Sequence, residues 1–279
     1  MLHSRIILTS LCVLFALAAV QTRAQPDYHR TVIVDPTSTG FANFNTIQSA
    51  INTGVPDFPT ERWTVLIYSG VYTETVTLGN RKGNVNLVGV DPDAVIIQPP
   101  LGFDGIVIDG VGERNNTIRN LTIHIRDETG TGDNLDGILI KRTLSGTDPS
   151  DVTIENVTIN LDADSSRAIR AVVPVSNVAI TGITIDCTAH AGSGIVFDDT
   201  VSHVILSDST ITMSVGDAVL FGGGIVGDRP ASTLLRGLTL QTDGENPVRV
   251  VGSAEGLSVL YSIHITADRV ADLVVRAAK

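Results

Sequence analysis

Six short segments of the sequence carry charged residues at matching positions of a strand-like pattern. Aligned on their alternating apolar residues, they share an opening position that holds Asp104, Asp136, Arg167, Ser193, Asp217 and Asn246. The central outward position holds Val107, Leu139, Arg170, Val196, Leu220 and Arg249. The next outward position holds Asp109, Lys141, Val172, Asp198, Gly222 and Val251. If the segments are neighbouring strands, side chains in each row lie within about 5 Å of one another.

These rows permit two interpretations. In the first, Arg167, Arg170, Asp198, Asp217 and Arg249 form one mixed-charge patch. The arginines then hold a sugar carboxylate, while Asp198 and Asp217 serve as acid and base. In the second, the rows are a solvated ladder of alternating charges, in which each pair contributes about 0–1 kcal/mol. The sequence leaves both interpretations open.

The sequence predicts no cofactor and no metal site, with calcium as the alternative. Carboxylates cluster in the glycine-rich stretch DETGTGDNLDG, at Asp127, Glu128, Asp133 and Asp136. Such oxygen ligands suit Ca²⁺, but their spacing fits no EF-hand loop, so a flexible acidic loop is the other interpretation. The histidines show no metal-ligand spacing. Cys187 continues an alternating apolar pattern and is expected in the core.

The elements that would position these side chains come from an internal repeat. Seven segments share an apolar residue, a bend residue two positions later, and then a period-two alternation, as in NTIRNLTIHI from Asn116 and NVAITGITID from Asn177. The bend residues are Gly89, Asn120, Asn156, Gly182, Asp208, Gly237 and Ser262. Gly, Asn and Asp readily adopt positive φ. Two strands joined by a bend in each repeat predict an all-β fold, a right-handed parallel β-helix solenoid.

The two ends of the chain have different expected roles. Residues 1–24 have the charged start, apolar run and small terminal residue of a secretory signal peptide; a membrane anchor is the alternative. Residues 25–279 are expected to form one β-helix domain that is secreted, periplasmic or extracellular. An amphipathic helix at Asn43–Thr53 is expected to cap the first coil. The tail from Thr266 to Ala278 predicts a second capping helix, with a last strand at Leu273–Arg276 as the alternative.

The charge balance narrows the class of partner. The formal net charge is −11 at pH 7, and removal of the signal peptide leaves 17 basic and 30 acidic residues, a net charge of −13. Such a surface argues against nucleic acid and anionic membranes, and disfavours a densely anionic glycan unless a cation or basic patch intervenes. No segment after the signal is long and apolar enough to span a membrane. The oligomeric state stays open.

The first coils resemble a known family. The stretches VDPTSTGFANFNTIQSAINTGVP from Val34, RWTVLIYSGVYTETVTL from Arg62 and NVNLVGVDPDAVII from Asn84 are similar to the N-terminal region of pectin methylesterases and of the wider pectin-lyase-like group. The resemblance implies a parallel β-helix and a polysaccharide ligand. Trp63 and Tyr72 are expected to have structural roles, and Gln48 and Glu74 to satisfy caps and turns.

The same resemblance implies a catalytic set of two aspartates, an arginine and a glutamine. The nucleophile strand of the family is similar to Val215–Gly222, which places Asp217 at the nucleophile. Arg249 is the candidate for the late arginine of the family. The family's Q-A-V strand falls on Ser166–Val172, which has no glutamine, and its Q-D motif falls near His190–Gly194, which has no aspartate.

The sequence therefore predicts a secreted protein that binds or acts on polysaccharide, without intact pectin methylesterase activity. The absence of the family's glutamine and second aspartate favours a protein that is not an enzyme. Two alternatives remain. One is an active carbohydrate esterase or lyase that uses Asp198 and Asp217 with the arginines. The other is a structural or adhesion solenoid with no small ligand.

Overall fold

The structure is a computed structural model of the 279-residue chain. It describes residues 30–37, 44–79, 81–110, 115–126, 134–142, 149–225, 232–242, 247–251, 256–259 and 263–266. Contacts divide the chain into two units, Met1–Arg30 and Thr31–Lys279, and the description below concerns the second. The signal peptide predicted at 1–24 lies outside the described residues, as does all of the predicted C-terminal cap except Thr266.

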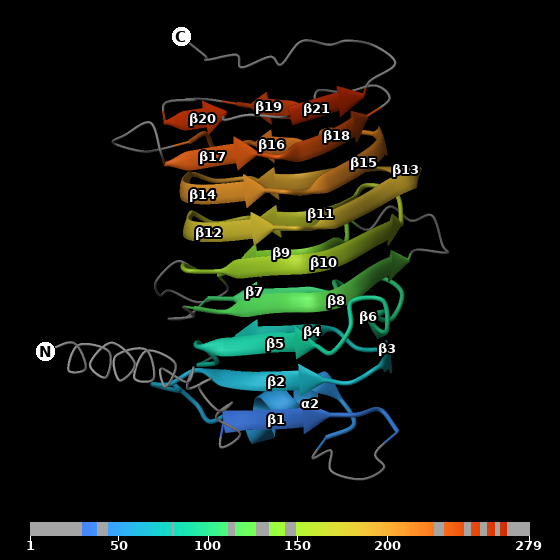
Figure 1. Ribbon diagram of the computed structural model, residues 1–279, viewed down its shortest axis with the longest axis vertical. Helices are drawn as coiled ribbons and strands as arrows, with labels where there is room; N and C mark the ends of the chain where they lie inside the picture. The colour runs from blue at the N-terminus through green and yellow to red at the C-terminus, as the bar shows by residue number, and fades with distance from the viewer. Residues whose placement is uncertain are drawn as a thin grey trace, which may run out of the picture. The chain divides into compact units, whose positions relative to one another are not determined.

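The chain winds through three columns of strands (Figure 1), and every strand pairing is parallel. Column one contains β1 (Thr31–Val34), β2 (Trp63–Ile67), β5 (Val85–Gly89), the first parts of β8 (Thr117–Arg126) and β10 (Thr153–Asp162), β12 (Val175–Thr181), β14 (Val201–Ser207), β17 (Thr233–Arg236) and β20 (Leu257–Val259). Column two contains β3 (Gly70–Tyr72), β6 (Val95–Ile97), the later parts of β8 and β10, the first part of β13 (Thr184–Phe197), β15 (Thr210–Val215), β18 (Leu238–Thr242) and β21 (Ile263–Thr266).

Column three contains β4 (Val76–Gly79), β7 (Ile106–Asp109), β9 (Asp136–Lys141), β11 (Ser166–Ala171), the last part of β13, β16 (Val219–Phe221) and β19 (Val248–Val250). Columns one and two belong to one sheet, and column three forms the other. The predicted right-handed parallel β-helix is confirmed.

The core lies inside the coils. Because side chains alternate along a strand, one face of each strand lines the interior. In column two the inward position stacks Ile97, Ile123, Ile159, Ile185, Ile211 and Leu240, all of them fully buried. In column three, the rings of Phe197 and Phe221 stack with centroids 5.2 Å apart and planes 5° from parallel. Cys187 is buried, as predicted.

The bends between columns one and two use positive φ, as the sequence indicates. Asn120, Asn156, Gly182, Asp208 and Gly237 have φ between 51° and 62°. Gly89 is different, because it does not have positive φ. A Cβ atom at Gly89 would lie 1.8 Å from the carbonyl oxygen of Asn120, so close approach of the next coil requires glycine there. Ser262, the last predicted bend, lies outside the described residues.

A second column of left-handed residues lies before the column-one strands or within their first residues. Asn84, Asn115, Asp151, Asn177 and His203 have φ between 54° and 57°. Their side chains also connect coils: Asn115 Nδ2 donates to Asn84 Oδ1 (3.2 Å), and Asn177 Nδ2 donates to Asp151 Oδ1 (3.0 Å). Short polar side chains tolerate this conformation best, which explains their recurrence.

The N-terminal end carries the predicted short helix. It consists of α2 (Ile47–Ser49), with Thr46 as its N-cap, and the π-helix Ala50–Gly54. The Glu74 carboxylate accepts from the backbone N–H groups of Ile47 and Gln48, both at 2.8 Å. The Gln48 side chain pairs with the Thr77 backbone, because its Oε1 accepts from Thr77 N (2.6 Å) and its Nε2 donates to Thr77 O (3.3 Å). Gln48 thus covers the edge of β4 as a peptide group would, and both residues have the capping roles expected of them.

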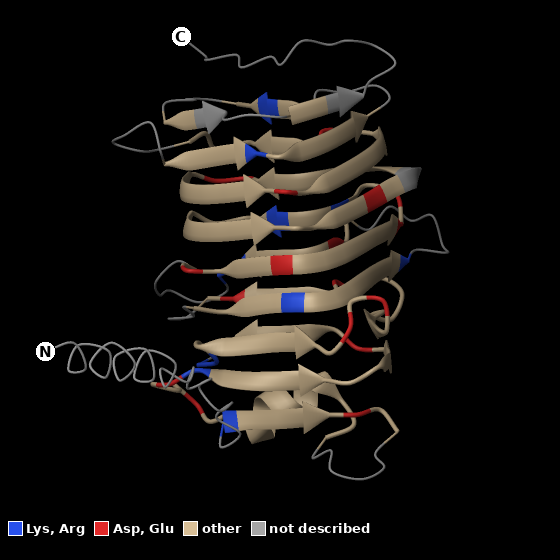
Figure 2. Ribbon diagram, in the orientation of Figure 1, with Lys and Arg blue, Asp and Glu red and all other residues tan. Residues whose placement is uncertain are grey.

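Across the described residues, the structure contains no helix of the length and hydropathy needed to cross a membrane. Charged residues are sparse on the strands of columns one and two (Figure 2).

Candidate functional site

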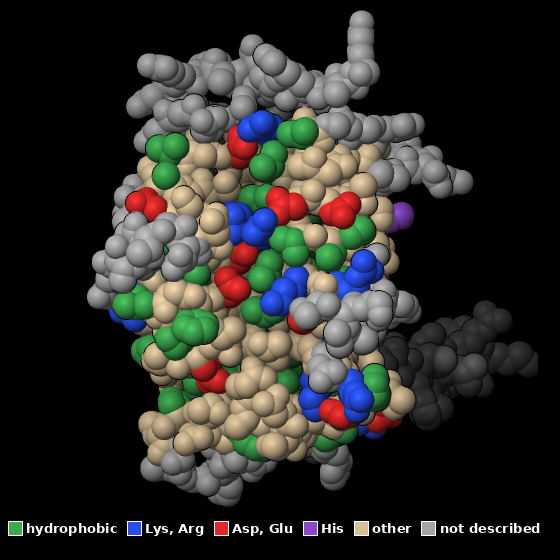
Figure 3. All heavy atoms as spheres, turned by 180° about the vertical axis from the view of Figure 1, so that it is seen from behind, with side chains coloured by type: hydrophobic (Ala, Val, Ile, Leu, Met, Phe, Trp, Pro, Cys, Tyr) green, Lys and Arg blue, Asp and Glu red, His purple; other side chains and the backbone are tan. Residues whose placement is uncertain are grey.

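The strand pairings reproduce the predicted central row and the described parts of the other two rows that they include; Asn246, the last residue of the opening row, lies outside the described residues. Arg167 pairs with Asp136 on one side and with Ser193 on the other. The central outward row runs in register through Val107, Leu139, Arg170, Val196, Leu220 and Arg249. Column three therefore presents one outward face on which these side chains lie side by side, with acidic, basic and apolar groups intermixed (Figure 3).

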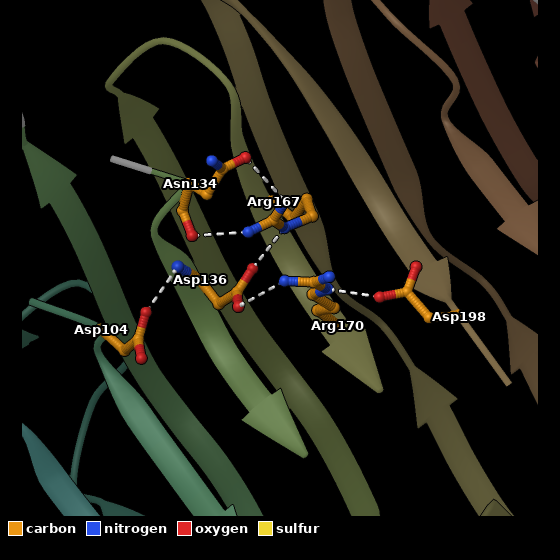
Figure 4. A network of polar contacts seen from close by, with 6 residues as sticks. All are labelled: Asp104, Asn134, Asp136, Arg167, Arg170 and Asp198. Carbon is orange, nitrogen blue, oxygen red and sulfur yellow. Dashed lines mark hydrogen bonds and ion pairs between the residues drawn. The ribbon is translucent and has the colours of Figure 1, made fainter. Parts of the chain in front are cut away.

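Asp136 is the centre of a polar network on this face (Figure 4). Its side chain is only 3% exposed. Arg167 Nε donates to its Oδ1 (2.6 Å), and Arg170 Nη1 lies 3.9 Å from its Oδ2. The backbone N–H of Asp136 donates to Asp104 Oδ1 (2.9 Å), and the Arg167 guanidinium also donates to the side chain and carbonyl oxygens of Asn134.

Burial sets the protonation of this carboxyl. Loss of hydration raises the pKa of Asp136 to about 6. The guanidinium groups of Arg167 and Arg170 act in the opposite direction, and the Asp104 carboxylate adds to the increase. Asp136 thus titrates close to neutral pH although two arginines lie beside it.

The pair formed by Asp217 and Arg249 repeats the geometry of Asp136 and Arg170. In each pair the aspartate is buried and lies at or just before the start of a column-three strand, and the arginine occupies the central outward position of the next coil. Arg249 Nη1 lies 3.5 Å from Asp217 Oδ2. The Asp217 side chain is 8% exposed and that of Arg249 is 50% exposed. Each buried aspartate therefore lies beside an arginine that is partly exposed to solvent.

A shallow depression lies between these two pairs. Its volume is about 220 Å³, and it is lined by Ser165, Arg167, Ala191, Gly192, Ser193, Val215 and Gly216. The small residues at 191–193 leave room between Arg167 and the segment that ends at Asp217. Gly216 has φ 113°, and a Cβ there would lie 1.7 Å from the Gly192 carbonyl oxygen, so the floor requires glycine.

The structure divides the five predicted site residues into two groups. Arg167, Arg170 and Asp198 belong to the Asp136 network, in which Arg170 Nε donates to Asp198 Oδ2 (2.6 Å). Asp217 and Arg249 form the other group. Asp198 follows the end of β13, whereas Asp217 precedes the neighbouring strand β16. The two carboxylates therefore lie at opposite ends of adjacent strands and contact different arginines.

Sequence reasoning missed the central place of Asp136 and the part played by Asn134. Asp136 did appear in the opening row beside Arg167, but the row gives no measure of burial. Val196, which lies in the predicted central outward row, is only 3% exposed. Among the described residues, no group of three or more His, Cys, Asp or Glu side chains is placed to hold a metal ion. Three members of the predicted calcium cluster, Asp127, Glu128 and Asp133, lie outside the described residues.

Comparison with known proteins gives local matches in sequence. No family model matches the chain. Pectinesterase/pectinesterase inhibitor 18 from Arabidopsis thaliana is 35% identical over 84 residues, which are 30% of this chain and 14% of that protein. Probable pectinesterase/pectinesterase inhibitor 32 from the same plant is 38% identical over 71 residues, which are 25% of this chain and 12% of that protein. The chain thus matches only a small part of the length of these relatives.

Solved structures with similar strand winding include pectin methylesterases. The carrot enzyme has a TM-score of 0.48 at 13% identity, with 86% of this chain and 83% of that chain covered. The enzyme PemA from Erwinia chrysanthemi has a TM-score of 0.42 at 12% identity, with 85% and 93% covered. The strand pairings make the protein a parallel β-helix, and parts of its sequence are similar to plant pectinesterases.

Proposed function

We propose that this protein binds polysaccharide on the outward face of column three, with one sugar ring in the depression beside Arg167 and Ser193. The observation that carries the proposal is the depression itself, open to solvent between two arginine–aspartate pairs. Its volume is below the roughly 300–1,000 Å³ of pockets that enclose drug-sized ligands, which suits a single ring of a longer chain. Sugar hydroxyl groups both donate and accept hydrogen bonds, so they can pair with the arginine N–H groups and with the aspartate oxygens of this face.

We further propose that the protein does not cleave methyl esters as pectin methylesterases do. That chemistry, as the family resemblance implies it, needs a protonated carboxyl and an ionised one beside the same ester. The segments aligned with the family's catalytic strands line or adjoin the depression, and they provide Arg167, Ser193 and Asp217 in one register row. Of these three residues, only Asp217 carries a carboxylate.

A carbohydrate esterase or lyase is the second candidate function. One observation favours it: Asp136, with its pKa of about 6, lies next to Asp104, and two arginines lie beside it. A carboxyl that is partly protonated at neutral pH could transfer a proton to a sugar oxygen. Its side chain is 3% exposed, however, which restricts contact with a polymer and favours the binding function.

Secretion is part of the proposal. The pattern of residues 1–24 is that of a cleaved secretory signal. A polysaccharide-binding protein would then meet its ligand outside the cytoplasm.

A binding assay with highly methyl-esterified pectin tests the proposed function. Ser193→Tyr should fill the depression and weaken binding about tenfold or more, which corresponds to about 1.4 kcal/mol. Thr184→Tyr places the same ring on the exposed face of column two and should bind like the natural protein. Equal binding by both variants would refute the depression as the site.

A methanol-release assay on the same pectin tests the proposed lack of esterase activity. The natural protein, Asp217→Ala and the exposed control Glu155→Ala should all give only background release. Release by the natural protein and Glu155→Ala that is lost in Asp217→Ala would show an esterase and overturn the second part of the proposal.

A further inference from the structure

We propose that the column-three face selects an uncharged stretch of polysaccharide and rejects polyanionic chains. This inference rests on the proposed function and adds the class of ligand to it. It follows from the ion pairs that the arginines of this face already form.

Each arginine in the described part of this face has an aspartate partner. Arg167 donates to Asp136 and Arg170 donates to Asp198, both at 2.6 Å, and Arg249 lies 3.5 Å from Asp217. Asp104 adds a fourth carboxylate, which accepts only from a backbone N–H among the contacts given above. Three guanidinium groups thus face four carboxylates, so the cluster offers a polyanion no net attraction.

Burial makes these pairs difficult to separate. The side chains of Asp136 and Asp217 are 3% and 8% exposed. An anionic ligand that recruited Arg167 or Arg249 would leave a carboxylate buried without its cation, which is strongly unfavourable. The arginines therefore contribute their remaining N–H groups to a ligand without giving up their charge.

The exposed atoms between the pairs suit hydroxyl groups. Arg249 presents N–H donors from its half-exposed guanidinium, the 36%-exposed Asp198 presents acceptor oxygens, and Ser193 presents a hydroxyl beside the depression. Leu220 lies beside Arg249 in the central outward row and offers an apolar contact to the C–H face of a sugar ring. The formal net charge of the chain, −11, also disfavours an anionic ligand, as the local cluster does.

Two forms of one polymer provide the test. Isothermal titration at pH 7.5, without divalent cations, would compare fully methyl-esterified polygalacturonate with the same preparation after saponification, matched in chain length. The esterified form should bind at least tenfold more tightly, and its affinity should change little between 50 and 300 mM salt, conditions chosen to vary screening. Saponified polymer that binds equally well or better, with affinity that falls as salt rises, would overturn the inference while leaving polysaccharide binding intact.

A charge variant separates local from overall electrostatics. In Asp198→Asn the amide oxygen can still accept from Arg170, but one negative charge is removed from the face. Affinity for the saponified polymer should rise about threefold or more relative to affinity for the esterified polymer. The control Asp208→Asn removes the same charge at an exposed bend between columns one and two, where asparagine suits the positive φ. Equal effects of both variants would refute local selection, and binding of neither polymer by the natural protein would instead refute the proposed function.

Discussion

At the scale of single residues, Asp136 combines features that usually exclude one another. It is buried, it contacts two arginines, and its pKa is still raised to about 6. The reason is that loss of hydration raises the pKa by more than the guanidinium groups lower it, and the Asp104 carboxylate raises it further. The ionised form of this residue is therefore a cost to the folded state at neutral pH.

The pH dependence of stability follows from that pKa. A carboxyl whose folded-state pKa exceeds its unfolded value of about 3.9 contributes stability that is fully present below pH 4. That contribution is lost as the pH rises through about 6. Between pH 4 and pH 7.5, the natural protein should therefore lose about 2 kcal/mol of its free energy of unfolding relative to Asp136→Asn. Urea unfolding of both proteins across this range measures it.

Asp208→Asn, at an exposed aspartate, serves as the control and should show a much smaller change. If the free energy of unfolding of the natural protein instead rose with pH relative to Asp136→Asn, Arg167 and Arg170 would outweigh burial and the pKa of Asp136 would be lowered.

At the scale of elements, glycine occurs at the bends for two separate reasons. Gly182 has φ 62°, and the nearest atom to an added Cβ would be 3.7 Å away, so there the backbone conformation alone favours glycine. At Gly89 the limit is space, since the Asn120 carbonyl oxygen would lie 1.8 Å from a Cβ. The sequence pattern places both residues in one column, and only the packing of the next coil distinguishes them.

Alanine substitutions should reveal this difference. Gly182→Ala should cost about 1 kcal/mol, the price of a left-handed conformation for an L-residue. Gly89→Ala should cost about 3 kcal/mol, because the carbonyl of the neighbouring coil must move. Gly182→Asn should be tolerated, whereas Gly89→Asn should not. Chemical unfolding of the four variants gives the comparison, and equal costs for the two alanine variants would contradict the assignment of Gly89 to close packing.

At the scale of the whole solenoid, each coil is stabilised chiefly by its neighbours. Inward side chains form columns that run from coil to coil, so no coil buries its apolar face alone. Phe197 and Phe221, whose rings stack, are among the largest side chains that are fully buried or nearly so in the described part of the chain. A cavity at one ring is therefore felt by the coils on both sides.

Truncation of either ring tests this coupling. Phe197→Ala and Phe221→Ala should each lower the free energy of unfolding by about 3–5 kcal/mol. The double variant should cost less than the sum, because the second change removes a contact that is already lost. Phe58, which is 64% exposed, gives a matched control, and Phe58→Ala should cost less than about 1 kcal/mol. Strict additivity of the two core variants would contradict the stacking as a shared contact.

The sequence by itself determined the winding and the register of the strands. Period-two alternation assigns each residue to the inside or outside, and a shift of one residue would turn every apolar side chain outward. This alternation is enough to align the rows through Arg167 and Arg170. It also places the bends between strands, which fall at Asn120, Asn156, Gly182, Asp208 and Gly237.

Only the tertiary structure decided which of these side chains meet and which are buried. Arg170 occupies the same register row as Val196, yet its guanidinium reaches Asp136 and Asp198 in the coils on either side. The burial of Asp136, the depression at Ser193 and the close contact at Gly89 depend on residues about 25 to 35 positions away in sequence. Side-chain direction, hydration and free volume arise from those neighbours, so no pattern along the chain encodes them.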